Sequence, residues 1–420
     1  MLAFKNAFLI DGTGSAPLAN ATVLVDGKFV VQAGQNLPIP EGAQIIDLQG
    51  KPLLPGFSDA HTHMGGSAGP LPGLPDTAKN KGNGGPRRPH RSSRFESYDY
   101  SAHREAALQW GVTTLRSAGD FTPEIIDFRN DVNAGKIRSP RMVVAGRYFQ
   151  AKGGHPLWSV FFGDPYIGEN SCVLIDETTD IPAEVNKMAD LGVDWIKVTV
   201  GDDNKFKYPD TKLPTLTEDQ LRQIVETAHS RSLPVMAHID DVGDLIRAAR
   251  VGIDSIEHTI NVASSPDHEM TDEALSLLTG RDVWVVPTMV VTYLRDGSIP
   301  GAPLVWPALQ TAVARMIEAG VQLGVGCDSG IPFIPYGECV HIEMELLTKV
   351  GYSPLQAVTA ATGGNARMMR KADVFGTVAP GKAADLVVLG SNPLDDIKNT
   401  RDVRLVLRDG AIVHDRLLSV

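Results

Sequence analysis

Short apolar runs, each ended by a turn signal, fill both ends of the chain. These runs are Ala7–Ile10, Ala21–Val25 and Lys28–Val31 near one terminus, and Leu386–Leu389, Val403–Leu407 and Ala411–Val413 near the other. Asp26-Gly27 and Asp409-Gly410 separate neighbouring runs and are strong hairpin dipeptides. Two β-rich ends around a different middle predict one small sheet domain, assembled from residues 1–54 and 373–420.

Residues 55–372 instead alternate apolar strands with amphipathic helices. The predicted strands include Val112–Leu115, Arg141–Ala145, Trp195–Val200, Val235–Ala237, Ser255–Ile256, Trp284–Val286 and Leu323–Val325, and the helices include Glu218–Ser230, Gly243–Val251 and Thr271–Leu278. Nearly continuous apolar strands between helices indicate a parallel sheet, so the fold class is α/β. About eight such units favour a closed (β/α)8 barrel over an open doubly wound sheet. The early strands also lack a Gly-rich dinucleotide or phosphate-binding fingerprint.

Composition narrows the class of protein. With 43% hydrophobic and 21% charged residues, the chain has the composition of a globular protein with a large core. A net charge of -11 argues against nucleic acid or an anionic membrane as partner. No segment approaches the roughly 20 apolar residues of a membrane helix, and the first ten residues are typical of a strand, not of a signal peptide. Three widely spaced cysteines argue against a disulfide framework, so we expect a reducing, cytoplasmic setting.

A Gly/Pro-rich, basic segment between Gly65 and Arg94 interrupts this regular pattern. It follows the first barrel strand and carries Arg87, Arg88, Arg91 and Arg94. One interpretation is a solvated loop over the barrel mouth. The other is a lid whose arginines, Arg87 and Arg88 among them, bind an anionic group of the substrate.

Side chains able to bind a metal lie within or at the ends of several predicted strands. They are His61 and His63, Lys197, His238, His258 and Asp328. Taken singly, each has an ordinary explanation: a hydrogen-bonded structural histidine, a lysine that reaches the surface, or an aspartate that opens a turn. Together they predict a metal site, because the catalytic groups of a barrel project from the carboxyl ends of different strands. No cysteine pair has zinc-finger spacing, so the ligands would be imidazoles and oxygen donors.

Four longer motifs resemble the amidohydrolase superfamily over essentially the whole chain. They are Leu54-Pro55-Gly56-Phe57-Ser58-Asp59-Ala60-His61-Thr62-His63, Gly252 to His258, Gly326-Cys327-Asp328-Ser329-Gly330 and Gly376 to Leu386. Gly153-Gly154-His155-Pro156 is similar to a segment of the branch that contains Xaa-Pro dipeptidases and arginine carboxypeptidases with a carboxylated lysine. Imidazolonepropionase-like enzymes resemble the chain more distantly, because they lack the lysine ligand. The resemblance implies a distorted (β/α)8 TIM barrel with a small β-sandwich formed from both termini.

The resemblance also implies two divalent metal ions, with zinc expected, although manganese, cobalt and iron suit such ligands as well. His61, His63 and Asp328 would bind one ion, His238 and His258 the other, and N-carboxylated Lys197 would bridge them. A hydroxide shared by the ions would attack an amide carbonyl, while Asp328 would accept its proton and pass it to the leaving amine. His155 would donate a hydrogen bond to the carbonyl oxygen, or else serve as a structural histidine in a glycine turn.

Two departures from the dipeptidase pattern bear on the substrate, which we expect to be a dipeptide, an N-acyl amino acid or a similar small secondary amide. The long Gly/Pro segment is one, and Asp240-Asp241 after His238 is the other. These carboxylates would bind a cationic substrate group or cap the helix that starts near Val242-Gly243. The alternatives are a mononuclear deaminase or cyclic-amide hydrolase with unmodified Lys197, and a non-catalytic scaffold. The resemblance further implies a homo-oligomer.

Overall fold

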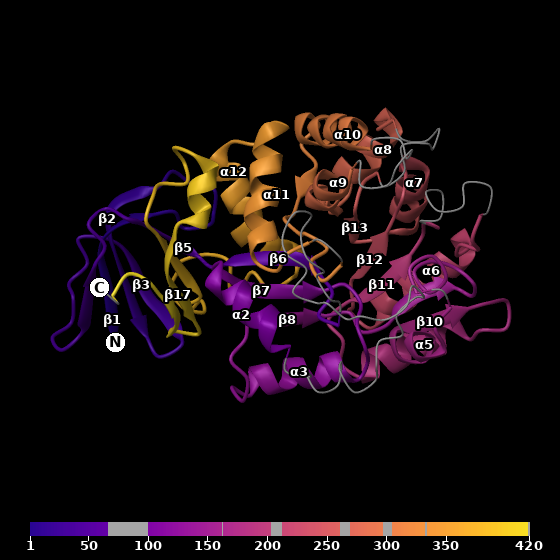
Figure 1. Ribbon diagram of the computed structural model, residues 1–420, viewed down its shortest axis with the longest axis horizontal. Coiled ribbons are helices and arrows are strands. Elements are labelled where there is room, and N and C mark those ends of the chain that lie inside the picture. The colour runs from indigo at the N-terminus through magenta and orange to yellow at the C-terminus, as the bar shows by residue number, and fades with distance from the viewer. Residues whose placement is uncertain are drawn as a thin grey trace, which may run out of the picture.

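The computed structural model describes residues 1–65, 100–161, 163–202, 212–260, 269–296, 305–331 and 334–418. Figure 1 shows a sheet that contains both chain ends at one side of the molecule, beside a larger body of strands and helices. Arg87, Arg88 and the rest of the basic Gly/Pro segment after Gly65 lie outside the described residues. Within the described part of the chain, no helix has the length and apolar character needed to cross a membrane.

The first sheet has eight strands and joins the two ends of the chain. Its strands are β1 (Leu2–Leu9), β2 (Leu18–Asp26), β3 (Phe29–Gln35), β4 (Gln44–Asp47), β5 (Pro52–Pro55), β16 (Leu386–Leu389), β17 (Val403–Arg408) and β18 (Ala411–Asp415). Their order is β18-β17-β16-β5-β1-β2-β3, with β4 beside β1. The hairpins β2–β3 and β17–β18 turn at Gly27 and Gly410, as the dipeptides predict. Strands from the two ends meet where β5 pairs with β16, so both termini share one hydrophobic core.

Parallel strands make up the larger body. They are β6 (Phe57–Thr62), β7 (Val112–Ser117), β8 (Arg141–Val144), β9 (Tyr148–Ala151), β10 (Cys172–Ile175), β11 (Ile196–Thr199), β12 (Val235–His238), β13 (Ser255–Glu257), β14 (Trp284–Val286) and β15 (Gln322–Leu323). One sheet has the order β6-β7-β8 and the other β10-β9-β11-β12-β13-β14-β15. Backbone hydrogen bonds join the two sheets at both seams, from Ala60 N–H to the Val325 carbonyl (3.0 Å) and from Asp194 N–H to the Val144 carbonyl (2.7 Å).

Helices follow most of these strands and cover the parallel sheets (Figure 1). They are α2 (Ser101–Gln109), α3 (Glu124–Asn133), α4 (Pro165–Ser171), α5 (Ile181–Asp190), α6 (Glu218–Ser230), α7 (Val242–Val251), α8 (Asp272–Thr279), α9 (Met289–Arg295), α10 (Trp306–Glu318), α11 (Glu338–Lys349), α12 (Pro354–Thr359) and α13 (Asn365–Met368), with a π-helical turn η1 (Ala360–Gly364) and a 3-10 turn η2 (Ile397–Arg401). A capping box between Thr217 and Gln220 fixes the start of α6. The predicted helices are confirmed to within one residue at each end.

The apolar run before His61 is divided between the two bodies. β5 belongs to the first sheet and β6 to the parallel sheet. Gly56 lies between β5 and β6, where its backbone packs closely against the Thr113 side chain of β7. A Cβ atom on residue 56 would lie 2.1 Å from the Thr113 hydroxyl oxygen. Only glycine fits such a crossing without a shift of its neighbour. His61 remains near the carboxyl end of β6, and His63 follows it directly.

Candidate metal centre and active site

The predicted metal ligands gather at the carboxyl ends of the parallel strands. One donor atom each from His61, His258 and Asp328 lies within 4.8 Å of the other two. The imidazole centroids of His61 and His258 are 4.9 Å apart, and those of His258 and His238 are 4.5 Å apart. His63 lies on the other side of His61, with ring centroids 5.4 Å apart. Residues from β6, β12, β13 and the segment after β15 therefore form one cluster.

Asp328 faces the two histidines of β6. Its Oδ1 atom lies 3.1 Å from His63 Nε2 and 3.5 Å from His61 Nε2. Burial opposes the charged carboxylate, but the hydrogen bond from His63 and the nearby imidazoles outweigh it and hold the pKa of Asp328 well below its usual range. The backbone of Asp328 is left-handed, with φ of 57°. A non-glycine residue in that region carries strain of order 1–3 kcal/mol, a feature that occurs often at functional sites.

Lys197 lies on β11 and is 2% exposed. Its Nζ atom has no hydrogen-bond partner among the described residues. Burial lowers the pKa of Lys197 to about 8, although the carboxylates of Glu257 and Asp328 act in the opposite direction. A buried amine without partners costs free energy, so this side chain calls for a ligand or a chemical modification.

A buried ion pair orients His61. The Nδ1 atom of His61 lies 2.7 Å from Glu257 Oε2, and Arg116 Nη2 donates to Glu257 Oε1 at the same distance. Burial, followed by the charge of Lys197, lowers the pKa of His61 to about 4, so the ring is neutral at pH 7. The proton on Nδ1 then points to Glu257, and the lone pair of Nε2 points to the cluster.

His63 and His258 have neutral partners behind them. His63 Nδ1 lies 2.8 Å from the carbonyl oxygen of Gly119 and 3.1 Å from the Tyr148 hydroxyl. His258 Nδ1 lies 2.7 Å from the Thr288 hydroxyl. Burial disfavours the protonated ring of His63, but the hydrogen bond to Asp328 raises its pKa, whereas burial lowers the pKa of His258 well below its usual value.

Several residues that hydrogen-bond to the candidate ligands were not predicted from the sequence. Glu257 and Arg116 are the charged residues of two short strands, Ser255–Glu257 and Val112–Ser117. That pattern indicates a buried pair, since an unpaired charge is rarely buried. Tyr148 and Thr288 carry no such signal, because a tyrosine in a strand and a threonine before a helix are common without any role.

His155 lies beside the cluster. Its ring stacks on that of His238, with centroids 4.4 Å apart, and its Nδ1 atom lies 2.5 Å from the Ser159 hydroxyl. Burial, followed by the charge of His238, lowers the pKa of His155 well below its usual value. The structure therefore brings His155, on the turn after β9, next to the candidate metal ligand His238.

Asp240 and Asp241 have different surroundings. Asp240 Oδ1 lies 3.2 Å from His238 Nε2, whereas the carboxylate of Asp241 accepts a hydrogen bond from Asp244 N–H (2.9 Å) and caps α7. The capping alternative thus holds for Asp241. Asp240 is 1% exposed and contacts a proposed ligand directly.

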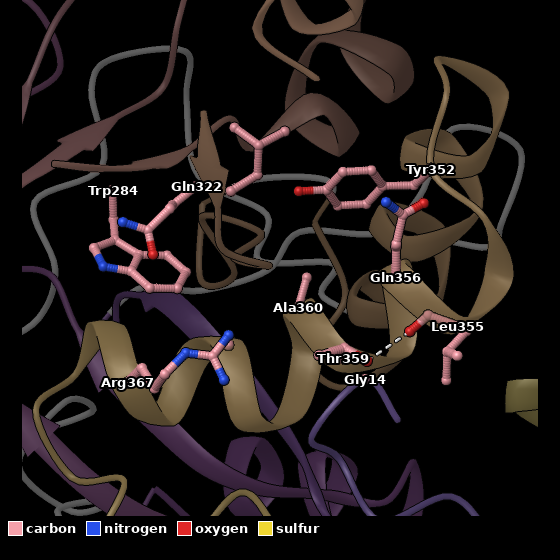
Figure 2. A pocket seen from close by; sticks show the side chains of 11 residues that line it. Gly14, Trp284, Gln322, Tyr352, Leu355, Gln356, Thr359, Ala360 and Arg367 are labelled. Carbon is pink, nitrogen blue, oxygen red and sulfur yellow. Dashed lines mark hydrogen bonds between the residues drawn. The ribbon is translucent and has the colours of Figure 1, made fainter. Parts of the chain in front are cut away.

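A separate pocket of about 230 Å³ opens at the opposite end of the strands. It lies at the amino ends of β14 and β15, which begin at Trp284 and Gln322, and Figure 2 shows Arg367 and Tyr352 at its sides. None of the candidate site residues lines it. Active sites of barrels lie at the carboxyl ends of the strands, so this pocket is not part of the cluster.

Comparison with known proteins identifies the family. A sequence model described as the amidohydrolase family matches residues 53–413. The chain belongs to the amidohydrolase family. This confirms the resemblance that the motifs carry, and it makes this amidohydrolase a hydrolase of carbon–nitrogen bonds. Members of the family generally bind divalent metals, and the cluster of His61, His258 and Asp328 offers candidate ligands.

Curated relatives are similar over nearly their whole length. An ochratoxinase of Aspergillus niger is 26% identical over 428 residues, covering 95% of this amidohydrolase and 83% of that protein. An imidazolonepropionase of Salinispora tropica is 24% identical and covers 90% and 88% of the two chains.

Solved structures share the fold. A Xaa-Pro dipeptidase with bound methionine has a TM-score of 0.79 at 24% identity, covering 98% of this chain and 99% of that one. The crystal structure of the A. niger ochratoxinase has a TM-score of 0.78 at 23% identity and covers 99% and 95%.

Proposed function

We propose that this amidohydrolase is a metal-dependent enzyme that cleaves the amide bond of a small secondary amide, such as a dipeptide or an N-acyl amino acid. One observation carries the proposal: Lys197 presents a buried amine without a hydrogen-bond partner among the described residues, beside the imidazoles of His61 and His258 and the Asp328 carboxylate. Neutral imidazoles and a carboxylate are the donors that zinc and similar divalent ions prefer.

The proposed architecture is a distorted (β/α)8 barrel over residues 55–372 and a small β-sandwich over residues 1–54 and 373–420. The hydrogen bonds at both seams of the parallel sheets support a closed ring of strands. The pairing of β5 with β16 supports a second unit made of both termini.

The ligand set fits two divalent ions, and we propose zinc. His61, His63 and Asp328 would hold one ion, His238 and His258 the other, with N-carboxylated Lys197 between them. A lysine carbamate supplies anionic oxygens where an ammonium would repel both cations, and a lowered pKa favours the neutral amine from which it forms. When bound, such ions lower the pKa of a water molecule and polarise a carbonyl group.

Asp328 and His155 would carry out proton transfer and hydrogen-bond donation during the reaction. Asp328, held as a carboxylate, would accept a proton from the attacking water and deliver it to the leaving amine. His155, if the Ser159 hydroxyl donates to its Nδ1, carries its proton on Nε2 and would donate it to the carbonyl oxygen. Asp240 would contact a cationic part of the substrate or orient His238. Arg87 and Arg88 stay a prediction for binding an anionic group.

The second candidate function is a mononuclear deaminase or cyclic-amide hydrolase with unmodified Lys197. The similarity to an imidazolonepropionase favours it, because that relative is named for a different substrate class. The buried Lys197 next to Glu257 and Asp328 favours the amide-cleaving enzyme instead. A non-catalytic scaffold is disfavoured, since every predicted ligand position is filled.

The deciding experiment measures metal ions per chain in protein produced with ample zinc and bicarbonate, together with hydrolysis of dipeptide and N-acyl amino acid libraries. About two ions per chain and release of free amino acid support the proposal. One ion per chain with activity on a cyclic amide or an amidine favours the second candidate. Neither ions nor activity after reconstitution would contradict both.

The expected setting follows from composition and the family resemblance. We propose a homo-oligomer in a reducing, cytoplasmic compartment that acts on a small molecule, without nucleic acid or membrane partners. The three cysteines, all free and buried, support the reducing compartment. Size-exclusion chromatography with light scattering tests the oligomer.

A further inference from the structure

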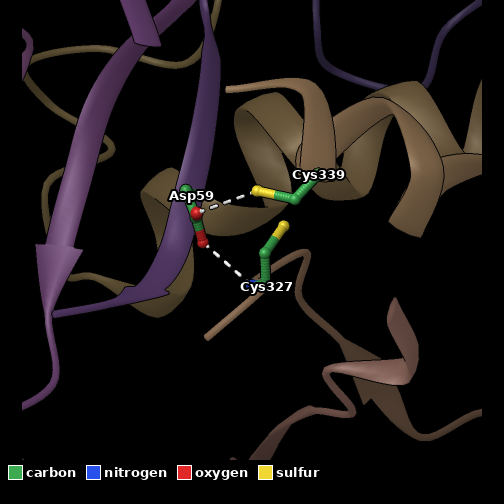
Figure 3. A group of neighbouring side chains, drawn as sticks. All are labelled: Asp59, Cys327 and Cys339. Carbon is green, nitrogen blue, oxygen red and sulfur yellow. Dashed lines mark hydrogen bonds between the residues drawn. The ribbon is translucent and has the colours of Figure 1, made fainter. Parts of the chain in front are cut away.

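A second buried cluster lies directly beneath the proposed metal site. It consists of Asp59 on β6 and the two cysteines Cys327 and Cys339 (Figure 3). All three side chains are fully buried. Among the residues that the structure describes, no lysine or arginine forms an ion pair with the Asp59 carboxylate, so a potential charge is buried at considerable cost.

The hydrogen bonds of Asp59 converge on the ligand segments. Asp59 Oδ1 accepts from the backbone N–H of Cys327 (2.9 Å) and from that of His61 (3.2 Å). Asp59 Oδ2 accepts from the Ser329 hydroxyl (2.8 Å) and from the Cys339 thiol (3.7 Å). One carboxylate thus holds the residues on both sides of Asp328 and also the backbone of His61.

The hydrogen bonds of Asp59 surround a residue with a strained backbone, Asp328. Asp328 has a φ of 57°, a left-handed conformation that a non-glycine residue keeps only when its surroundings enforce it. The two neighbours of Asp328 in the chain, Cys327 and Ser329, are the ones that Asp59 binds. The carboxylate therefore compensates the strained turn that aims Asp328 at the imidazoles.

A metal site made of the three buried side chains is a weaker explanation. Burial raises the pKa of the Cys327 thiol well above its usual value and that of Cys339 to about 11, so both stay protonated at pH 7. Both oxygens of Asp59 are already engaged as hydrogen-bond acceptors. Metal binding needs thiolates and free carboxylate lone pairs, and the cluster offers neither.

We propose that Asp59 is a positioning residue, which fixes the turn at Asp328 relative to His61 and so sets the geometry of the metal ligands. The inference rests on the proposed function, because it concerns the same ligands. Asp59 itself does not touch substrate or ions. A misplacement of about 1 Å at such a site is enough to cost about a hundredfold in rate.

The test compares Asp59→Ala, Asp59→Asn and Ser329→Ala with the parent enzyme. Asp59→Ala removes all four hydrogen bonds, so kcat should fall about a hundredfold and the ion dissociation constant should rise about tenfold to a hundredfold. KM should change by less than about threefold, since ground-state contacts to the substrate are untouched. Asp59→Asn keeps one acceptor oxygen for Cys327 N–H and should restore kcat to within about tenfold of the parent.

Asp254→Asn is the matched control. Asp254 also accepts a backbone hydrogen bond between neighbouring strands, from Val235 N–H (2.7 Å), but at the amino ends of β12 and β13. This variant should lower the melting temperature without changing kcat or the ion dissociation constant. A purely structural role of Asp59 would give the same pattern in Asp59→Ala, with a lower melting temperature, unchanged kcat per bound ion and unchanged ion affinity. That result would overturn the proposal.

Ser329→Ala covers the case in which Asp59→Ala does not fold. It removes a single hydrogen bond beside Asp328, and a fall in kcat of about fivefold to tenfold per bound ion supports the positioning role. An unchanged kcat and ion affinity would contradict it. The parent enzyme separates the two hypotheses: a parent that binds no ions and cleaves no amide refutes the proposed function, whereas an active parent with unaffected variants refutes only the role of Asp59.

Discussion

Burial and hydrogen bonds together set the protonation states of the side chains at the centre of the site. His61 and His258 are held neutral, with lone pairs available to a cation, while Asp328 stays a carboxylate because the imidazoles outweigh its desolvation. Lys197 is unusual for a lysine, because it is 2% exposed and its amine has no hydrogen-bond partner among the described residues. The neutral imidazoles and the Asp328 carboxylate are thus in the protonation states that metal binding requires.

Replacement of Lys197 tests this view most directly. Lys197→Ala should reduce the number of bound ions and lower kcat/KM by at least about a hundredfold, the upper end of the loss caused by removing a residue behind a metal ligand. Ion content is measured by elemental analysis alongside steady-state kinetics. Lys187→Ala, at an exposed position on α5, is the matched control and should change neither quantity. Full ion content and activity in Lys197→Ala would exclude the bridging role.

The buried carboxyl group of Asp244 should make the stability of the fold depend on pH. Burial, followed by the charges of Asp241 and Asp240, raises its pKa from 3.8 to about 7. An acid whose pKa is higher in the folded state stabilises the fold below its unfolded pKa, and this contribution is lost as pH rises through the folded value. The loss from Asp244 therefore runs from about pH 4 to about pH 7, and its upper limit is about 4 kcal/mol.

Asp244→Asn removes this loss, because an amide does not titrate. The melting temperature of the variant relative to the parent should therefore rise between pH 4 and pH 7 and then level off. Asp219→Asn, at an exposed position on α6, is the control and should leave the difference flat. A flat difference for Asp244→Asn as well would show that the carboxylate is already charged at pH 4.

At the scale of elements, the sequence predicts strands and helices better than their junctions. Turn dipeptides and capping residues are local signals, so the hairpins at Gly27 and Gly410 and the start of α6 follow from them. The division at Gly56 depends on the approach of Thr113 from β7, a contact between residues far apart in the chain, and no local pattern carries it. The short strands β9 and β10 were not among the predicted strands.

The candidate site divides in the same way. The ligands were predicted because each one lies in or directly after a predicted strand, and His61, His63, His258 and Asp328 also lie in family motifs. Their supports, Glu257 with Arg116 and Asp59 with Ser329, depend on pairs of strands whose register the sequence does not reveal. The alternatives for Asp241 needed the structure for the same reason, and its carboxylate caps α7.

Gly56→Ala tests the junction between the two bodies. The new Cβ atom would lie 2.1 Å from the Thr113 hydroxyl oxygen and 2.4 Å from its methyl carbon, so the variant should lose about 1–3 kcal/mol of unfolding free energy. Chemical denaturation measures the loss. Gly34→Ala in β3 is the matched control, since its nearest neighbours are side-chain atoms of Leu37 at 3.9 Å, and it should change stability by less than about 1 kcal/mol.

A compensating variant separates steric conflict from glycine flexibility. Gly56→Ala combined with Thr113→Ala removes the hydroxyl and methyl groups that the new Cβ would meet, and only the Thr113 Cβ remains close, at 2.7 Å. The double variant should therefore recover part of the lost stability. No recovery would mean that the backbone at residue 56, and not the contact with β7, requires glycine.

At the scale of the whole molecule, the first sheet and the parallel sheets meet through both apolar and charged contacts. One face of the first sheet forms a core of its own, whereas Leu54, Val387 and Val406 from β5, β16 and β17 belong to the main core of the parallel strands. Arg141 on β8 bridges them, because it lies 3.2 Å from Asp385 and 2.8 Å from Asp409. The proposed ligands all belong to the parallel-strand body, so binding of ions should act on one body more than on the other.

Removal of the ions tests this separation. Ions that bind only the folded state stabilise it by about 2.7 kcal/mol when their concentration is a hundred times the dissociation constant. Chelation should lower the melting temperature and speed hydrogen–deuterium exchange at the carboxyl ends of β6, β12 and β13, where His61, His238 and His258 would lose the ions that they bind. Exchange in β2 and β3 should stay unchanged, since their buried side chains Ala21, Val23, Val25 and Val30 belong to the core of the first sheet. Equal acceleration in both bodies would show that the sheets unfold as one cooperative unit, and unchanged exchange at His238 and His258 would contradict their role as ligands.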